Sequence, residues 1–399
     1  MSVTSQSDVY YDPYDVEIWA DPYPTFRRLR DEAPLYCNEA HGFFAVSRYA
    51  DVEQGLVDRD TYISGRGAIL ELIKADIEFP SGVIIFEDPP VHTAHRGLLS
   101  RVFTPRKMNA LEPQVRDFCA RSLDPLVGTG GFDFVRDLGA EMPMRVIGML
   151  LGIPEADQAA IRDRSDANLR TEPGQPMRFP VDQVLSGEVF ADYIDWRADH
   201  PSDDLMTELL QAEFEDETGT RRRLSREEVL TYVNVVAGAG NETTTRLIGW
   251  TGKVLGDHPD QRRQLVEDRS LIPNAIEEIL RFEPPALQVA RYVTRDVEHY
   301  GQVVPEGSIM LFLMGAANRD ERRFPDGDRF DIHRQVGQHL TFSYGIHYCL
   351  GAALARLEGR IALDEILQRF PEWEVDLDNA RLASTSTVRG WETLPVATP

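Results

Sequence analysis

The sequence feature that most constrains the fold is one long helical stretch in the second half of the chain. Apolar residues recur at i, i+3 and i+4 spacing from Arg226 to Leu255, and Ser225 with Glu228 forms an S-x-x-E capping box at its start. At 1.5 Å per residue, such a helix is a rod of about 45 Å. A helix of that length would cross the whole molecule and form part of its core.

The rest of the sequence contains further helical stretches and a few short strand-like segments. Helical spacing also runs through Glu112–Leu126 and Leu350–Phe370. The strand-like segments lie toward the two ends of the chain: Gly42–Ser47, Arg291–Thr294, Ile309–Leu313 and Leu382–Val388. This order predicts a mainly α protein with a small β subdomain, drawn from about 34–48, 291–313 and 382–398. No repeat or flexible linker divides the sequence, so we expect one large domain over residues 1–399.

Two apolar stretches have no regular pattern. Tyr62–Pro90 mixes aliphatic residues with Gly and Pro, and Thr171–Pro180 is rich in Pro. Long apolar loops in a compact domain are often lids or binding loops. By themselves, however, these two stretches are better interpreted as loops that cover the core.

The charge balance and the cysteine count exclude several classes of protein. The 399 residues include 66 Asp and Glu against 42 Lys and Arg, a net charge of −24 that would repel the phosphates of nucleic acids. With 42% hydrophobic residues, the chain can bury a large core. It shows neither a signal peptide nor an apolar run of about 20 residues. Three scattered cysteines fit a reducing compartment, so we expect a cytoplasmic protein without a membrane anchor.

The segment around Cys349 carries the clearest chemical signal. Cys349 directly precedes the stretch Leu350–Phe370, so its thiol would face free backbone N–H groups and the positive end of a helix dipole, which favour the thiolate. Gly345 and Gly351 flank it and permit close approach of the backbone to a flat ligand. A thiolate on such a loop could be the axial ligand of a haem iron.

Two other interpretations of Cys349 remain open on these residues alone. A lone free cysteine usually behaves as a small buried apolar residue. It could also be the nucleophile of a hydrolase with His347 as base, although two residues apart on a turn is a poor geometry for that pair.

The loop FSYGIHYCLG closely resembles the haem-binding signature of the cytochrome P-450 superfamily, the haem-thiolate monooxygenases. That signature is Phe, Gly, any residue, Gly, any residue, His or Arg, any residue, Cys, any residue, Gly. The matching residues are Phe342, Gly345, His347, Cys349 and Gly351, whereas Ser343 stands where the family has its first Gly. The resemblance implies a haem b with Cys349 as axial ligand, inside the family's bundle of helices.

The long central helix carries a second match. Gly238 and Gly240 weaken its middle by about 1 kcal/mol each relative to Ala, and a Thr hydroxyl there can bond the i−4 carbonyl. The glycines alone favour a packing groove for a neighbouring helix. The string AGNETT from Ala239, however, is similar to the family's oxygen-binding motif. By resemblance, Ala239 and Gly240 border the oxygen site, and Glu242 with Thr243 is the acid–alcohol pair that delivers protons.

Two further segments are similar to family motifs that hold the haem in place. Glu278 and Arg281 match the family's buried E-x-x-R motif, with Arg334 as the candidate partner, although an exposed i, i+3 pair contributes only about 0.2–0.5 kcal/mol. The stretch DPPVHTAHR is similar to the family's D-P-P-x-H-T-x-x-R helix. Buried haem propionates need charged hydrogen-bond partners. Each base singly would be an ordinary surface residue, but the resemblance assigns this role to His92, Arg96, Arg291, His339 and His347.

The resemblance implies a monooxygenase that hydroxylates or epoxidises an apolar substrate with one oxygen atom of O2. Eight residues are expected, by their position in the family, to line the substrate pocket: Ile84, Ile85, Phe86, Val235, Val236, Ala286, Leu287 and Val289. Because they are almost all apolar, we expect a steroid, terpenoid, fatty acid or aromatic substrate. The alternatives are a peroxide-driven peroxygenase and a non-catalytic haem sensor or carrier, and the intact acid–alcohol pair argues against both.

The expected partners are an external ferredoxin and ferredoxin reductase, which would supply two electrons to a monomer. Ferredoxins of this type are acidic, so a protein of net charge −24 would need a local basic patch to bind one. The candidate bases flank the two segments expected near the thiolate: Arg101, Arg106, Lys107, Arg356 and Arg360.

Overall fold

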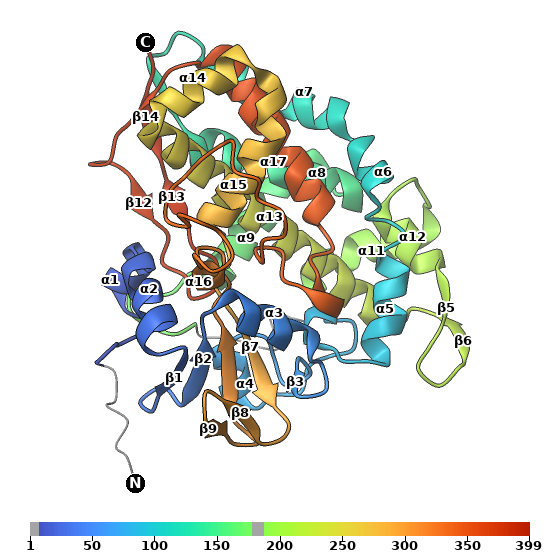
Figure 1. Ribbon diagram of the computed structural model, residues 1–399. Helices are drawn as coiled ribbons and strands as arrows, with labels where there is room; N and C mark the ends of the chain where they lie inside the picture. The colour runs from blue at the N-terminus through green and yellow to red at the C-terminus, as the bar shows by residue number, and fades with distance from the viewer. Residues whose placement is uncertain (1–7, 178–186) are drawn as a thin grey trace.

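In the computed structural model, which describes residues 8–177 and 187–399, helices pack around one long helix and a small β-sheet lies at one end (Figure 1). The long helix is α13 (Arg226–Asp257), two residues longer than its predicted stretch. The predicted capping box is confirmed: Ser225 Oγ accepts the backbone N–H of Glu228 at 3.1 Å, and the Glu228 carboxylate accepts that of Ser225 at 2.8 Å.

The main hydrophobic core surrounds α13. Leu230, Val233 and Leu247 are almost fully buried, and burial of a side chain of this kind contributes about 1.5–3 kcal/mol. The elements packed against α13 are η3 (Phe134–Gly139), α8 (Met142–Leu151), α15 (Ile272–Phe282) and α17 (Ala352–Arg369). Contacts on several sides hold the rod in place, so residues in its middle have fixed positions.

The remaining helices cover this core or connect it to the sheet. Their bounds are α1 (Val16–Ala20), α2 (Tyr23–Glu32), α3 (Tyr49–Val57), α4 (Leu70–Ala75), η1 (Ile84–Phe86), α5 (Val91–Leu99), α6 (Pro105–Asn109), α7 (Glu112–Leu123), η2 (Asp124–Leu126), α9 (Glu155–Leu169), η4 (Glu188–Phe190), α11 (Ala191–Asp199), α12 (Leu205–Gln211), α14 (Pro259–Glu267), η5 (Arg269–Leu271), α16 (Met314–Ala317) and η6 (Gly345–His347). No helix of the described residues is long and apolar enough to cross a membrane.

The main sheet joins strands from distant parts of the sequence, in the order β1-β2-β10-β7-β3. Its strands are β1 (Leu35–Asn38), β2 (Phe43–Val46), β3 (Tyr62–Ile63), β7 (Val289–Val293) and β10 (Ile309–Phe312). β10 is the central strand, parallel to β2 and antiparallel to β7, and all four of its residues are buried. The predicted strands near 42–47, 291–294 and 309–313 are therefore confirmed.

The C-terminal strand prediction is wrong in its bounds. Leu382–Val388 was expected to be one strand. In the structure, β12 (Arg381–Leu382) ends at Leu382, the first residue of the predicted strand, and pairs with β13 (Trp391–Thr393). Thr385 explains the interruption because its hydroxyl donates to Val388 O at 2.6 Å and accepts the N–H of Val388 at 3.3 Å. This local side-chain turn replaces strand pairing.

The other strands form small separate sheets. β14 (Pro395–Ala397) pairs with β11 (Glu374–Val375) and β4 (Gly131–Asp133), and two hairpins are β5–β6 (Glu213–Glu215, Arg221–Arg223) and β8–β9 (Val297–His299, Gln302–Val304). The irregular stretch Tyr62–Pro90 contains β3, α4 and η1. The last three residues of the stretch Thr171–Pro180 lie outside the described residues.

Candidate active site

Cys349 lies on the turn between η6 and α17. Its backbone N–H donates to Phe342 O at 2.8 Å, which closes the loop that begins at Phe342. The backbone N–H groups of Gly351 and Ala352, where α17 begins, donate to the Cys349 sulfur. A side chain at Gly351 would place its Cβ 4.0 Å from this sulfur. The loop therefore holds the free thiol of Cys349 at the start of a helix.

Burial raises the pKa of the Cys349 thiol, although several groups oppose it. Hydrogen bonding from Gly351 and the positive charges of Arg96 and Arg356 act in the lowering direction. The backbone N–H groups at the helix start thus favour the thiolate, as the sequence predicts, but burial outweighs them. A coordinated metal ion, by contrast, deprotonates a thiol outright.

Four of the predicted basic side chains gather beside the cysteine loop. His92 and Arg96 come from α5, Arg291 from β7 and His347 from η6. The rings of His92 and His347 lie 4.4 Å apart between centroids. Burial, followed by the charges of Arg291, His92 and Arg96, lowers the pKa of His347 to about 2. The four groups thus lie within electrostatic reach of one another.

This basic cluster has few acidic neighbours. Burial lowers the pKa of Arg291 to about 10, and the acid that interacts with it is Asp88. The Asp88 carboxylate already accepts the backbone N–H groups of Ser64 and Gly65, at 2.9 and 2.7 Å. Within residues 8–177 and 187–399, neither Arg96 nor Arg291 has an ion-pair partner. Since buried charges are normally paired, the cluster suits an anionic ligand.

His339, the fifth predicted base, lies outside this cluster. Its Nε2 is 3.1 Å from Glu277, whose carboxylate also accepts hydrogen bonds from Arg356 at 2.7 and 3.0 Å. Although burial opposes it, hydrogen bonding to His339 and Arg356 lowers the pKa of Glu277 to about 2. The Arg356 guanidinium also covers the ring of Phe342, at 4.5 Å. His339 is thus part of an ion-pair network that supports the cysteine loop.

One face in the middle of α13 is open, which means that no other part of the described chain packs against it there. Ala239 is exposed although most of the helix is buried, and a Cβ added at Gly238 would meet no atom within 4 Å. Thr243 lies one turn further on this face, and its hydroxyl donates to Ala239 O at 2.9 Å, as the sequence predicts. Gly240 faces elsewhere, because its Cβ would lie 2.5 Å from Ile147 of α8. Gly240 therefore permits close helix packing.

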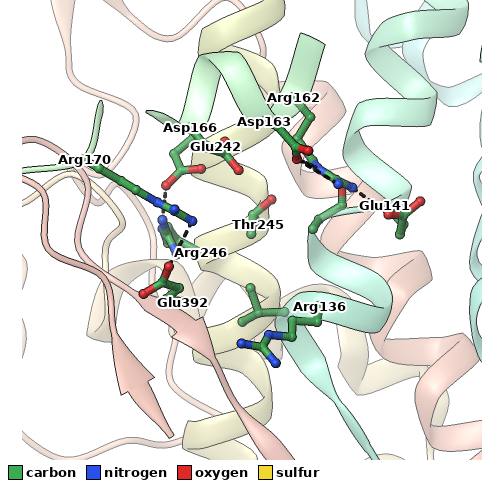
Figure 2. A pocket seen from close by; sticks show the side chains of 12 residues that line it. Arg136, Glu141, Arg162, Asp163, Asp166, Arg170, Glu242, Thr245, Arg246 and Glu392 are labelled. Carbon is green, nitrogen blue, oxygen red and sulfur yellow. Dashed lines mark hydrogen bonds and ion pairs between the residues drawn. The ribbon is translucent and has the colours of Figure 1, made fainter. Parts of the chain in front are cut away.

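Glu242 points away from Thr243, into a polar cavity of about 310 Å³ between α9, η3, α13 and β13. Figure 2 shows its carboxylate beside Asp166, with Thr245 and Arg246 on the same wall. Glu242 and Arg246 form a buried ion pair. Burial, and then the charge of Glu242, raise the pKa of Asp166 to about 7. The predicted acid and alcohol are neighbours in sequence, but their side chains leave α13 on different sides.

The structure brings Glu278, Arg281 and Arg334 together. Arg281 donates to both oxygens of Glu278 at 2.7 and 2.8 Å, and Arg334 donates to the same carboxylate at 3.0 Å. Glu278 and Arg281 are fully buried. Arg281 also donates to the carbonyl oxygens of Asn318 and Gly327, both at 2.8 Å. These contacts tie α15 to the segment that leads to the cysteine loop.

The predicted pocket residues fall into several environments. Phe86 packs in an apolar cluster that includes Val235 of α13, while Ile84 and Val236 belong to the main core. Leu287 packs instead with the N-terminal cluster around Phe26, and Ala286 and Val289 contact the core under the sheet. Ile85 is 46% exposed. The structure therefore places Phe86 and Val235 together and Leu287 away from them.

Sequence reasoning missed Asp166 and the fully buried Glu358. Asp166 belongs to α9, whose charged sequence is typical of a solvated helix, and Glu358 lies in α17 within an otherwise ordinary amphipathic pattern. Burial raises the pKa of Glu358 well above its ordinary range. No local signal identifies either residue, because the half-buried Asp166 and the buried Glu358 are each covered by α13, which is distant in sequence.

Known proteins resemble this chain over nearly its full length. A family model described as Cytochrome P450 matches residues 192–389. Putative cytochrome P450 123 of Mycobacterium tuberculosis is 40% identical over 395 residues, 98% of this chain and 97% of that protein. Vitamin D(3) 25-hydroxylase of Pseudonocardia autotrophica is 35% identical over 402 residues, 99% of this chain and 98% of that protein.

Solved structures agree with the sequence matches. Cytochrome P450 CYP109Q5 from Chondromyces apiculatus superposes with a TM-score of 0.85 at 33% identity, covering 97% of this chain and 98% of that chain. CYP109E1 from Bacillus megaterium, in complex with testosterone, superposes with a TM-score of 0.84 at 28% identity, covering 96% and 99%. The mainly helical fold with small sheets is thus shared with both.

Proposed function

Because this chain belongs to the cytochrome P450 family of haem-thiolate monooxygenases, we propose that Cys349 is its axial haem ligand and that it oxidises an apolar organic molecule. One oxygen atom of O2 would enter a C–H or C=C bond of the substrate, and the other would leave as water. The following paragraphs assign the parts of this reaction to residues of the chain.

The observation that carries this proposal is the basic cluster beside Cys349. Haem b has two propionate groups, and Arg96 and Arg291 are cations without ion-pair partners among the described residues. His92 Nε2 is also buried without a hydrogen-bond partner there. Charge-assisted hydrogen bonds from these groups would satisfy both carboxylates. The residues therefore fit the group that the family uses, with His347 beside them.

When bound, a haem with a thiolate ligand supplies the electron density that favours cleavage of the O–O bond. The chain supplies the ligand and its surroundings. The N–H groups of Gly351 and Ala352 hold the Cys349 sulfur in place, and the buried Glu278–Arg281–Arg334 contacts fix the segment before it. The open face of α13 at Ala239 leaves room for the reacting molecules.

Proton delivery is assigned to Thr243 and Glu242. The hydroxyl of Thr243 lies on the open face, where it can hold a proton for transfer. Glu242 faces the polar cavity on another side of α13, where protons from water can reach its carboxylate. A relay through the pair would thus cross the helix from the cavity to the site.

The substrate is proposed to be a hydrophobic molecule such as a steroid, terpenoid, fatty acid or aromatic compound. Apolar side chains at Phe86 and Val235 support this choice. Two relatives support the steroid class: one is named for vitamin D3 hydroxylation, and another was solved with testosterone.

The electron donor is proposed to be an acidic ferredoxin with its reductase. Lys107 pairs with Glu208, and Arg356 pairs with Glu277, so two of the five predicted bases are neutralised. The other three, Arg101, Arg106 and Arg360, have no ion-pair partner in the described part of the chain. Arg106 lies in α6 with Arg101 shortly before it, and Arg360 lies in α17, which packs against α6. We define these three residues as the docking surface.

The carbon monoxide difference spectrum of the reduced protein tests the haem assignment. The unaltered protein should show the red-shifted Soret band of thiolate-bound haem, and Cys349→Ala should lose it. Cys37→Ala and Cys119→Ala are matched controls that should retain the band. A Cys349→Ala protein with an unchanged band would contradict the proposal. A haem sensor would give the band but would not sustain substrate-dependent NADPH oxidation with added reductase and ferredoxin.

A further inference from the structure

The loop of residues 81–87 is held at both ends by polar groups. At its start, Ser81 Oγ donates to Glu228 of α13 at 3.3 Å. At its end, Glu87 accepts the backbone N–H of Gly82 at 2.8 Å and contacts His95 Nδ1 at 2.8 Å. Between these ends lie Ile84 to Phe86, so the polar groups determine where this apolar segment sits.

His95 is the centre of this arrangement. It lies on α5 with its side chain 1% exposed, and its ring contacts the rings of Tyr232 and Phe214 edge-on. Because a carboxylate only accepts hydrogen bonds, His95 Nδ1 carries the hydrogen that is shared with Glu87. The opposite nitrogen, Nε2, lies 3.9 Å from the Glu228 carboxylate, which is too far for a hydrogen bond, and it is buried without a hydrogen-bond partner among the described residues. One imidazole therefore lies between carboxylates of two separate elements.

Glu228 gives this arrangement a rigid base. Its carboxylate caps α13 and accepts two hydrogen bonds from Arg222 of β6, at 2.7 and 2.9 Å. Burial would raise the pKa of Glu228, but hydrogen bonds from Arg222 and Ser225 lower it, so the carboxylate stays charged beside His95. The anchor of the loop is thus the first turn of the longest helix.

The backbone of the loop also approaches α13 closely. Gly82 has φ +101°, and a Cβ there would lie 3.3 Å from Thr231 Cβ and 3.4 Å from Glu228 O. Further along the loop, Phe86 packs in the apolar cluster that includes Val235. Val235, Ala239 and Thr243 follow at i, i+4 and i+8, which is one face of α13. A shift of the loop would therefore change the surface that leads to Thr243.

We propose that His95 is a positioning residue that clamps the end of the loop 81–87 through its hydrogen bond to Glu87, while Ser81 ties the start of the loop to Glu228 of α13, and so determines how well bulky substrates bind. The inference rests on the proposed function, because it takes Ile84 to Phe86 to face the substrate. His95 occupies one of the three variable positions of the D-P-P-x-H-T-x-x-R pattern. The clamp is therefore a feature of this chain that the pattern itself does not specify.

Binding of two azoles to the holoprotein tests the clamp. Imidazole is small and binds haem iron without reaching the loop, whereas 4-phenylimidazole carries a ring that would extend toward it. In His95→Leu, the Kd of 4-phenylimidazole, measured by the Soret shift, should rise about tenfold, while that of imidazole stays within twofold. His95→Asn should recover most of the lost affinity, because its amide N–H can donate to Glu87. Ser100→Ala, an exposed change at the end of α5, is the matched control.

Amide hydrogen exchange gives a readout that needs no azole. In His95→Leu, the peptide that contains Gly82 to Glu87 should exchange faster, while peptides from α15 remain unchanged. Should His95→Leu yield no folded holoprotein, Glu87→Ala, which removes the acceptor, replaces it in both measurements, with the same direction of change expected. Equal Kd changes for both azoles, or unchanged exchange in residues 82–87, would overturn the proposal. A missing carbon monoxide band in the unaltered protein would instead refute the proposed function and leave the exchange result to decide the clamp.

Discussion

Replacement of Ser343 by Gly is expected to stabilise the protein, because Ser343 has a backbone conformation that suits Gly. Its φ is +60°, in the left-handed region, and its N–H donates to Leu340 O at 2.9 Å in the turn before Cys349. Its hydroxyl oxygen is buried without a hydrogen-bond partner among the described residues. The position therefore combines backbone strain with an unsatisfied polar atom.

The expected gain follows from these two features. Left-handed backbone costs a residue with a Cβ about 1–2 kcal/mol. A buried hydroxyl without a partner costs about 1–3 kcal/mol, and the greater freedom of Gly in the unfolded chain takes back about 0.4–1 kcal/mol. We expect a net gain of about 3 kcal/mol in the free energy of unfolding. For a chain of 399 residues, this gain raises Tm by roughly 3–4 °C.

Urea unfolding of the holoprotein, followed by circular dichroism and by the Soret band, measures the effect. Ser343→Ala removes the hydroxyl but keeps the Cβ, so it should give only part of the gain. Gly345→Ala is the opposite control: φ is +69° there, and a Cβ would lie 2.8 Å from Leu56 O, so stability should fall by about 2 kcal/mol or more. A Ser343→Gly protein no more stable than Ser343→Ala would refute the argument from backbone strain.

Three further predictions concern protons and electrons. The Thr243→Ala protein should keep its haem but form at least about tenfold less product per NADPH consumed, with hydrogen peroxide formed instead. An unchanged ratio of product to NADPH would contradict the proton relay through Thr243. Because burial and the charge of Glu242 raise the pKa of Asp166 to about 7, the folded protein holds a proton that the unfolded chain loses above about pH 4. Stability should therefore fall as pH rises from 4 to 7, and Asp166→Asn should flatten that decline in urea titrations; an identical decline in both proteins would refute it. Changing Arg101 and Arg106 to Glu should slow the reduction of the haem protein by an acidic ferredoxin, measured by stopped flow. The change should also weaken the salt dependence of that rate, because the Debye length falls from about 10 Å at 0.1 M salt to about 3 Å at 1 M. Reduction rates that respond neither to the substitutions nor to salt would place the docking site elsewhere.

Elements set by local sequence were the most predictable. The start of α13 at Arg226 was predicted correctly from the capping residues Ser225 and Glu228 and from the apolar spacing that follows them. β10 was equally clear, because its four apolar residues form a run that is typical of a buried strand. In both cases the signal lies within the element itself, so no knowledge of its neighbours was needed.

Properties that depend on neighbours distant in sequence could not be predicted. Glu242 was expected to act with Thr243 beside it, but its contacts are Arg246 one turn later and Asp166 of α9. The sequence likewise indicates the helix start beside Cys349, but not the burial that outweighs it. Burial results from the packing of many segments, and no local pattern records it.

The order of strands in the main sheet has a consequence for synthesis of the protein on the ribosome. β2 ends at Val46, and its partner β10 begins at Ile309, more than 250 residues later. At about 5–20 residues per second, the edge of β2 that β10 later covers stays unpaired in the nascent chain for roughly 13–50 s. Such an edge is a template for pairing with other chains. Protection of this edge by a chaperone during translation should therefore increase the yield of folded protein.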